Sequence, residues 1–394
     1  MTHRVPVAEP PNHGAPLLLT TNAELFLHLL RAIAAQMVVF GHAIMLFEIW
    51  PALQPPQFVY IQKMGVAIFF FLSGFVISYT CQRKMSQRTY GFDEFLFDRA
   101  VRIYIVLIPS LIFIAACDGF CWLYWKCDFE FQSDFTFQAA AANLMFLQLY
   151  PQRYFDHSFA GGWLTQSVLG SGRSLWTLAV EWWLYVEFGW LMLPAAGSVW
   201  RRWGGRVLAM VSLPVVVHAT FGGRDTGFAL LWIMGVLVMH VMQGRTLPQW
   251  DSRWLALVGC TTFVLSFACP AIPKEGYHFR MNVCFSLAIA ILLLAHQNLR
   301  FSVYERLRVA TAIRFFADYS FTLYLTHYTI LHWARVLWGT RVSQEVGVLC
   351  VILLSNVIAI AIAWVTEFKY RVLREWLAPF LFTRAAQSVS DADT

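Results

Sequence analysis

The first apolar stretch of the chain carries two residues that could do chemistry. In LLRAIAAQMVVFGHAIML, Arg31 and His42 stand eleven residues apart, which is about three turns of an α-helix. Both side chains would therefore point the same way, ~16 Å apart along the helix axis. A neutral imidazole can take a proton near pH 7, and an arginine can stabilise developing negative charge. The alternative is a histidine that only hydrogen-bonds to a neighbouring helix.

Two arginines open another apolar stretch, FDRAVRIYIVL. Arg99 and Arg102 are i,i+3 neighbours, so they share one face of the predicted helix. Such a pair could bind a polyanion such as a nucleotide or the phosphates of coenzyme A (CoA). The alternative is that they anchor the helix at the inner membrane surface, an interpretation that suits the preceding Arg83, Lys84 and Arg88 better.

Further polar groups interrupt two other apolar stretches. SLWTLAVEWWLYVEFGW contains Glu181, Tyr185 and Glu187, and YSFTLYLTHYTILHWAR contains Tyr324 and His327 at i,i+3. Two carboxylates within one membrane span are costly, so we expect at least one to pair with an arginine or histidine of another helix. The sequence therefore predicts a polar site inside an apolar helix bundle, either a catalytic site or a transport pathway.

The remaining polar residues add less specific signals. Ser73 and Gly74 form a small pair that permits close helix approach. His332 and Arg335 lie further along the same stretch as His327, and Glu367 closes the last apolar run. The histidines have no HExxH or similar spacing, so no metal site is predicted.

Composition places these residues in a membrane protein. Hydrophobic residues make up 58% of the chain and charged residues 13%, against roughly 45–50% and about 25% in soluble domains. The mean hydropathy is +0.56. The net charge of +6 comes from short basic clusters between apolar runs, the pattern of orientation signals rather than of nucleic-acid binding.

Apolar runs long enough for a helical span, ~20 residues, predict an all-α bundle of about ten spans. Two of the runs are short, so the count could be nine. The longest gap, 126–174, holds an apolar piece, FQAAAANLMFLQLY, that could be an interfacial or re-entrant helix. The predicted spans are 25–47, 58–80, 102–125, 175–196, 206–220, 227–241, 253–271, 279–297, 312–338 and 345–367.

The distribution of basic residues orients the predicted bundle. With a cytosolic N-terminus, inner loops carry 19 of the 29 Lys and Arg residues and outer loops carry 8. The positive-inside rule then predicts that both termini are cytosolic.

In order and spacing, the motifs resemble the bacterial membrane-bound acyltransferase 3 family, the O-acyltransferases of polysaccharides, lipopolysaccharide, nodulation factors and macrolides. The resemblance covers about 25–375 and rests on LLRAIAAQMVVFGHA, GVAIFFFLSGFVIS, DRAVRIY, SLWTLAVEWWLY and DYSFTLYLTH. It implies a transmembrane acyltransferase domain over 23–377, between a disordered cytosolic tail at 1–22 and a second cytosolic tail at 378–394.

The resemblance also implies roles for individual residues. His42 matches the essential first-span histidine of the family and Arg31 its companion arginine, and Arg99 and Arg102 match a pair implicated in acyl-CoA use. We expect His42, Arg31 and Glu181 to be catalytic and Arg99 and Arg102 to bind the donor. Ser73, Tyr185, Tyr324 and His327 are expected substrate-binding residues.

The expected function is acyl transfer, in the first instance of an acetyl group. A multi-pass protein of the bacterial inner membrane would take acetyl-CoA from the cytosol and modify a hydroxyl of a carbohydrate or lipid-linked glycan, with His42 as the general base. His42 would lie toward the outer half of its span, unless the helix is tilted or starts later, so the side of transfer stays open. The alternatives are a transporter or flippase of a polar glycolipid, and a scaffold whose buried charges only pair helices.

Overall fold

The computed structural model is built from helices, and its described residues contain no strand. A long first helix, α1 (Thr21–Leu46), leads through a short 3-10 turn to α2 (Ile61–Gln87) and α3 (Phe92–Gly119), which continues as a π-helical turn to Tyr124. The structure describes residues 18–55, 57–87, 90–126, 128–148, 167–193, 203–213, 227–243, 251–267, 279–299, 304, 308–339 and 341–376. Both predicted terminal tails lie largely outside these residues.

The later helices are shorter. The elements after α3 are α4 (Phe137–Leu144), α5 (Trp176–Met192), a helical segment at 203–213, α7 (Phe228–Gln243), α8 (Ser252–Ser266), α9 (Phe279–Gln297), α11 (Ala310–Asp318), α12 (Ser320–Trp338) and α13 (Gln344–Val365). A 3-10 turn, Glu367–Lys369, follows α13. Four helical stretches, Thr21–Leu46, Ile61–Ser86, Phe92–Tyr124 and Gln344–Trp376, are long and apolar enough to cross a membrane.

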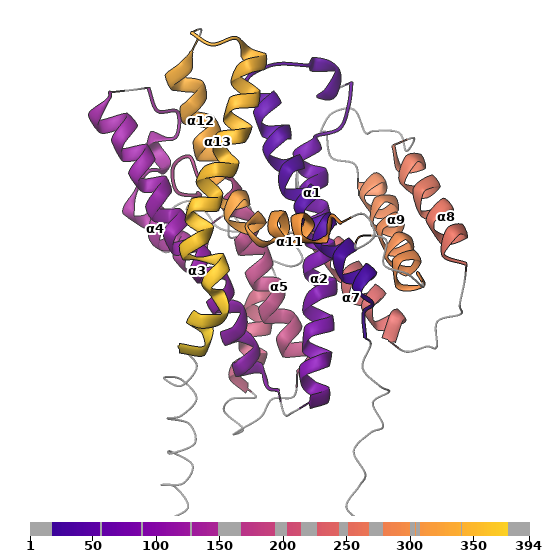
Figure 1. Cartoon of the computed structure of the whole chain (residues 1–394). Helices are drawn as coiled ribbons and strands as arrows, with labels where there is room; N and C mark the ends of the chain where they lie inside the picture. Colours follow the sequence, from indigo (N-terminus) through magenta and orange to yellow (C-terminus); the bar gives the residue numbers. More distant parts are fainter. Residues whose placement is uncertain are drawn as a thin grey trace, which may run out of the picture.

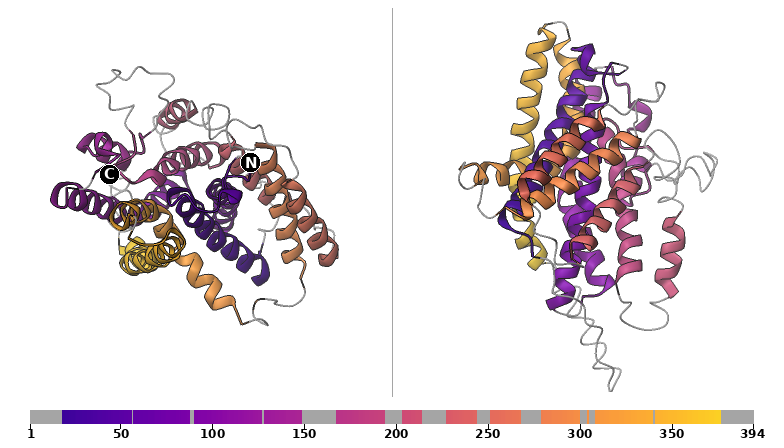
Figure 2. Two further views of the ribbon diagram at one scale, coloured as in Figure 1. Left: turned by 90° about the horizontal axis from the view of Figure 1, so that it is seen from above. Right: turned by 90° about the vertical axis from the view of Figure 1, so that its right-hand side faces the viewer.

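Helices α1 and α2 lie at the centre of the bundle (Figures 1 and 2). Helix α2 packs against α1, α7 and α9, while α1 also contacts α12 and α13, and α3 lies against α5 and α12. Helices α8 and α9 pair with each other at one side of the bundle. The five helices α1, α2, α3, α5 and α12 therefore surround one interior region.

Glycine allows the closest of these contacts. A Cβ atom at Gly74 of α2 would overlap the carbonyl group of Trp232 on α7, and one at Gly235 of α7 would overlap the carbonyl of Phe71 on α2. The predicted role of Gly74 in close helix approach is therefore confirmed by the α2–α7 packing.

The largest difference from the predicted spans lies at 312–338. This stretch is two helices, because α11 ends at Asp318 and α12 begins at Ser320. Figure 1 shows α11 lying across the bundle, whereas α12 runs along it. At the break, the hydroxyl of the fully buried Tyr319 donates to Asn356 of α13 over 2.7 Å, and Glu367 accepts the backbone N–H of Thr322 in the first turn of α12. The predicted re-entrant piece contains the short helix α4, and only 203–213 of the region around the predicted span 206–220 is described.

Candidate active site

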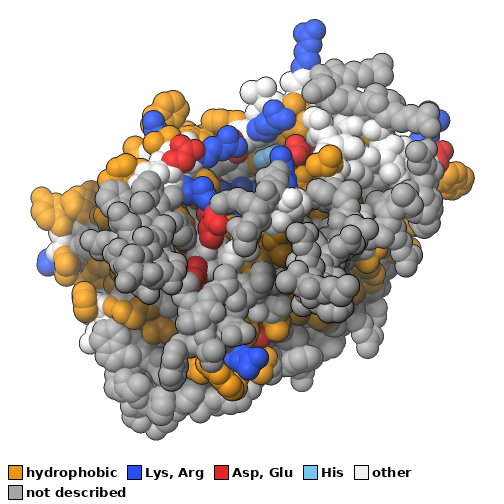
Figure 3. Space-filling model, turned by 90° about the horizontal axis from the view of Figure 1, so that it is seen from below, with side chains coloured by type: hydrophobic (Ala, Val, Ile, Leu, Met, Phe, Trp, Pro, Cys, Tyr) orange, Lys and Arg blue, Asp and Glu red, His pale blue; other side chains and the backbone are white. Residues whose placement is uncertain are grey.

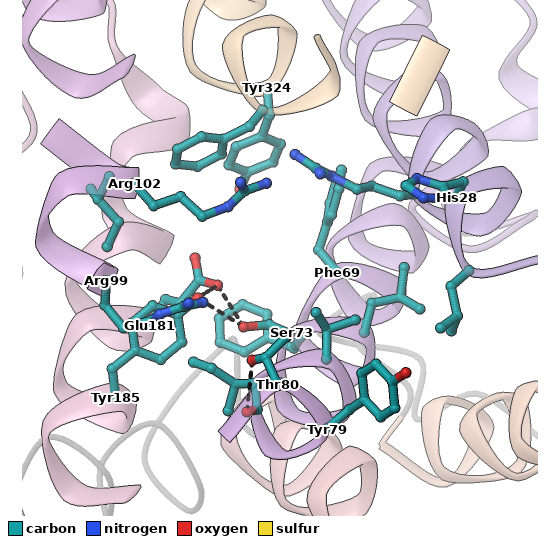
Figure 4. Close-up of a pocket in the computed structure, with 18 of the residues that line it drawn as sticks. His28, Phe69, Ser73, Tyr79, Thr80, Arg99, Arg102, Glu181, Tyr185 and Tyr324 are labelled. Atoms are coloured by element: carbon teal, nitrogen blue, oxygen red, sulfur yellow. Dashed lines mark hydrogen bonds between the residues drawn. The ribbon is translucent and has the colours of Figure 1, made fainter. Parts of the chain in front are cut away.

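A pocket of about 550 Å³ lies between α1, α2, α3, α5 and α12. Figure 4 shows its lining, with Arg99, Arg102, Glu181 and Tyr185 opposite His28. Viewed from below, Lys, Arg, Asp and Glu side chains gather at this end of the molecule (Figure 3). Seven of the nine residues predicted for the site line this single pocket: Arg31, Ser73, Arg99, Arg102, Glu181, Tyr185 and Tyr324.

The basic wall of the pocket is formed by α3. Within the described residues, neither Arg99 nor Arg102 makes a hydrogen bond or an ion pair, and the buried Nε of Arg99 has no partner. Their guanidinium groups only face aromatic rings, Arg99 at 5.9 Å from the centroid of Phe95 and Arg102 at 5.3 Å from that of Tyr370. Two cations without an ion-pair partner among the described residues therefore line a pocket that an anionic ligand could occupy.

The neighbouring basic residues are used differently. Asp98 is fully buried and accepts hydrogen bonds from Lys84, from Tyr90 over 2.8 Å and from Nε of Arg374 over 2.6 Å. These contacts tie α2 and the C-terminal end of the described chain to α3, so Lys84 joins two helices, and its expected role as an anchor at the inner membrane surface stays a prediction. Arg83 is exposed to solvent, and Arg88 lies outside the described residues.

The acidic wall of the pocket is held by hydroxyl groups. Glu181 of α5 accepts a 2.7 Å hydrogen bond from Ser73 of α2 and another from Tyr185, one turn further along α5. Glu187 accepts from Ser212 over 2.5 Å. Within the described residues, neither carboxylate forms an ion pair with an arginine or histidine, so the expected pairing is not found there. Hydroxyl donors satisfy these carboxylates instead.

Arg31 reaches the site as one half of an ion pair. Its guanidinium lies 2.8 Å from Oε1 of Glu367, and the other carboxylate oxygen accepts from the backbone N–H and the hydroxyl of Thr322 over 3.1 and 3.0 Å. Thr322 is in the first turn of α12. Glu367 therefore binds Arg31 and also caps α12, where a negative charge is favoured.

The two predicted histidines lie together beyond one end of the pocket. Nδ1 of His42 is 3.0 Å from Nε2 of His327, and the ring of Tyr328 meets that of His42 edge-on at 5.3 Å. His327 stands one turn of α12 after Tyr324, whose ring lines the pocket and packs 5.4 Å from that of Phe69. His42 contacts α12 directly, and Arg31 is linked to α12 through Glu367, so both side chains of α1 are directed toward the region around α12.

Other polar residues on these helices serve the scaffold. Arg335 donates to the carbonyl of Leu46 over 3.0 Å, at the end of α1. Asp118, which the sequence interpretation missed, accepts from Ser171 and from Trp333 over 2.7 Å. The sequence did contain a signal for Asp118. It is a carboxylate inside the apolar run 102–125, and such a group needs hydrogen-bond donors from other parts of the protein.

Comparison with known proteins gives one match. The acyltransferase 3 model, described as an acyltransferase domain, matches residues 24–368, from the first turn of α1 to the turn after α13. This range is most of the 394-residue chain and includes all nine predicted site residues. Neither the curated proteins nor the solved structures provide a match.

The different uses of the basic residues predict different stability effects. Asp98→Asn should destabilise the protein by about 2 kcal/mol, because it leaves Lys84 and Arg374 without their carboxylate. This is less than the ~3–5 kcal/mol of a fully buried pair, because both cations keep about a quarter of their side-chain surface exposed. Arg99→Gln and Arg102→Gln should leave stability unchanged. Thermal unfolding in detergent measures all three, and an equal loss in the arginine variants would contradict the assignment.

Proposed function

Because the chain belongs to the acyltransferase 3 family, we propose that it transfers an acyl group, in the first instance acetyl, from acyl-CoA to a hydroxyl of a glycan or glycan-like acceptor. The family and the apolar helices make it a membrane-bound acyltransferase. The donor, the acyl group, the acceptor and the residue roles are our proposal.

The observation that carries the proposal is the unpaired basic wall of the pocket. CoA is multiply anionic, and Arg99 and Arg102 offer two guanidinium groups that form no ion pair with a carboxylate of the described residues. Arginine suits phosphate because its planar group can donate two parallel hydrogen bonds. Apolar side chains such as Val66, Phe70 and Ile103 line the same pocket and suit the less polar arm of the donor. We therefore assign the pocket to acyl-CoA.

The proposed reaction uses the histidine beyond the pocket. Tyr324 lines the pocket and its ring also contacts that of His327, so the thioester would have to pass this ring to reach the histidine pair. His42 takes the proton of the acceptor hydroxyl while its oxygen bonds to the thioester carbonyl carbon. The carbon–sulfur bond then breaks, and the departing thiolate takes the proton from His42.

Other pocket residues support this reaction in our proposal. Arg31 supplies positive charge near the reaction path, although Glu367 neutralises part of it. Glu181 holds the hydroxyls of Ser73 and Tyr185 in place, and the three groups together orient the donor.

We also propose a ten-span arrangement in the bacterial inner membrane with both termini in the cytosol. The positive-inside rule supports it. Arg31 in the first half of α1 and Arg99 in the first third of α3 would then line a pocket in the cytosolic half of the bundle, on the side where acyl-CoA is found. His42, further along α1, would lie deeper in the membrane.

Membranes containing the protein should transfer label from acetyl-CoA into a glycan or lipid fraction. His42→Ala should lower the initial rate at least 100-fold, within the ~10²–10⁴-fold range for loss of a general base. His240→Ala, a histidine outside the pocket and the pair, is the matched control and should keep the wild-type rate. Equal rates for wild type and His42→Ala would remove His42 from its role. An absence of acyl transfer with every glycan fraction would end the enzyme interpretation and leave transport to be tested.

The topology is measured with reporter fusions. Green fluorescent protein at the C-terminus should fluoresce, because it folds in the cytosol, and alkaline phosphatase inserted after Gly339, between α12 and α13, should be active outside. Gly339 is a suitable site because no atom of the described residues lies within 4 Å of the position that its Cβ would occupy. Active phosphatase at the C-terminus would reverse the proposed orientation.

A further inference from the structure

The hydrogen bonds of His327 determine which of its nitrogens carries a proton. Its Nδ1 lies 2.8 Å from the carbonyl oxygen of Tyr324 and 3.2 Å from that of Leu323, one turn back on α12. A carbonyl oxygen can only accept, so Nδ1 of His327 must be the donor. The side chain is completely buried, which leaves no water to offer a different partner.

The same burial keeps this ring neutral. Within the described part of the chain, no carboxylate forms an ion pair with His327 or His42. A buried imidazolium without a counter-ion is costly, so His327 carries a single N–H, at Nδ1. Its Nε2 then has a lone pair and must accept the 3.0 Å hydrogen bond from Nδ1 of His42. It follows that the lone pair of neutral His42 is on Nε2.

We propose that His327 is a positioning residue, which holds His42 in the tautomer whose Nε2 is the basic nitrogen. This rests on the proposed function, and it replaces the expectation that His327 binds substrate, since the ring is buried against its own helix and His42.

The pair also acts during the reaction. When Nε2 of His42 takes the hydroxyl proton, the resulting imidazolium keeps donating from Nδ1 to His327, and this charge-assisted bond is stronger than the neutral one. In a Ser-His-Asp triad a carboxylate fixes the histidine tautomer in this way. Here a neutral imidazole fills that place, itself oriented by the backbone of α12. The edge of Tyr328 restricts rotation of the His42 ring.

Two substitutions of similar volume separate positioning from packing. The amide oxygen of His327→Gln can accept from His42, whereas the thioether of His327→Met accepts poorly. We expect His327→Met to lower kcat at least 100-fold with the KM values for donor and acceptor within two-fold of wild type, and His327→Gln to stay within ten-fold in kcat. A role in packing alone would affect both variants alike. His327→Asn, whose amide is too short to reach His42, should match His327→Met and replaces it should the methionine variant not fold.

A second measurement does not depend on activity. The ¹⁵N NMR spectrum of histidine-labelled protein, with the His42 signals assigned by their loss in His42→Gln, should show the proton on Nδ1 of His42. This preference should weaken in His327→Met, where the backbone carbonyl of Val38 is the acceptor that remains for His42. A proton on Nε2 of wild-type His42, wild-type kcat in His327→Met, or equal impairment of the glutamine and methionine variants would overturn the proposal. The predicted spectrum in a protein without transferase activity would support the hydrogen-bond assignment and refute the proposed function.

Discussion

The carboxylate of Glu367 connects three helices at the base of the site. It lies 2.8 Å from the guanidinium of Arg31 on α1, accepts the backbone N–H of Thr322 in the first turn of α12, and follows α13 directly. Only 7% of its side chain is exposed, so it needs all of these donors. The cap helps to fix the first turn of α12 in place. It therefore also helps to fix the positions of Tyr324 beside the pocket and of His327 beside His42, because both residues are on α12. The site depends on this contact more than on any single catalytic residue.

Desolvation explains which polar residues are structural and which are free to bind. Buried carboxylates throughout the described bundle have donors: Asp98 has a lysine, a tyrosine and an arginine, and Glu181 has two hydroxyls. Arg99 and Arg102 face the pocket without such partners in the described chain. A site prepared for an anionic donor keeps its cations unpaired until the ligand binds, and both arginine side chains here are only half-buried, which lowers the cost of leaving them unpaired.

Much of the site could be predicted because an ionisable residue in an apolar helix is too costly to expose to lipid and must face the interior of the bundle. That rule brought Arg31, Arg99 and Glu181 to one pocket, and helical periodicity placed Arg31 and His42 on one face. Pairings between helices could not be predicted in this way. The approach of His327 to His42 depends on the packing of α1 against α12, and the break before Ser320 depends on contacts with α13. The hydroxyl partners of Glu181 were missed because serine and tyrosine donors carry no charge signal in the sequence.

The central claim is that the pocket binds the anionic donor through its unpaired arginines. Equilibrium binding of CoA to the purified protein in detergent tests this without requiring an acceptor. Arg99→Gln and Arg102→Gln should each weaken binding at least ten-fold, since a hydrogen bond to a charged group contributes about 1.5–3 kcal/mol. Arg341→Gln, which changes an exposed arginine far along the chain, should bind as wild type does. Absence of CoA binding by the wild type, or unchanged affinity in both pocket variants, would contradict the account.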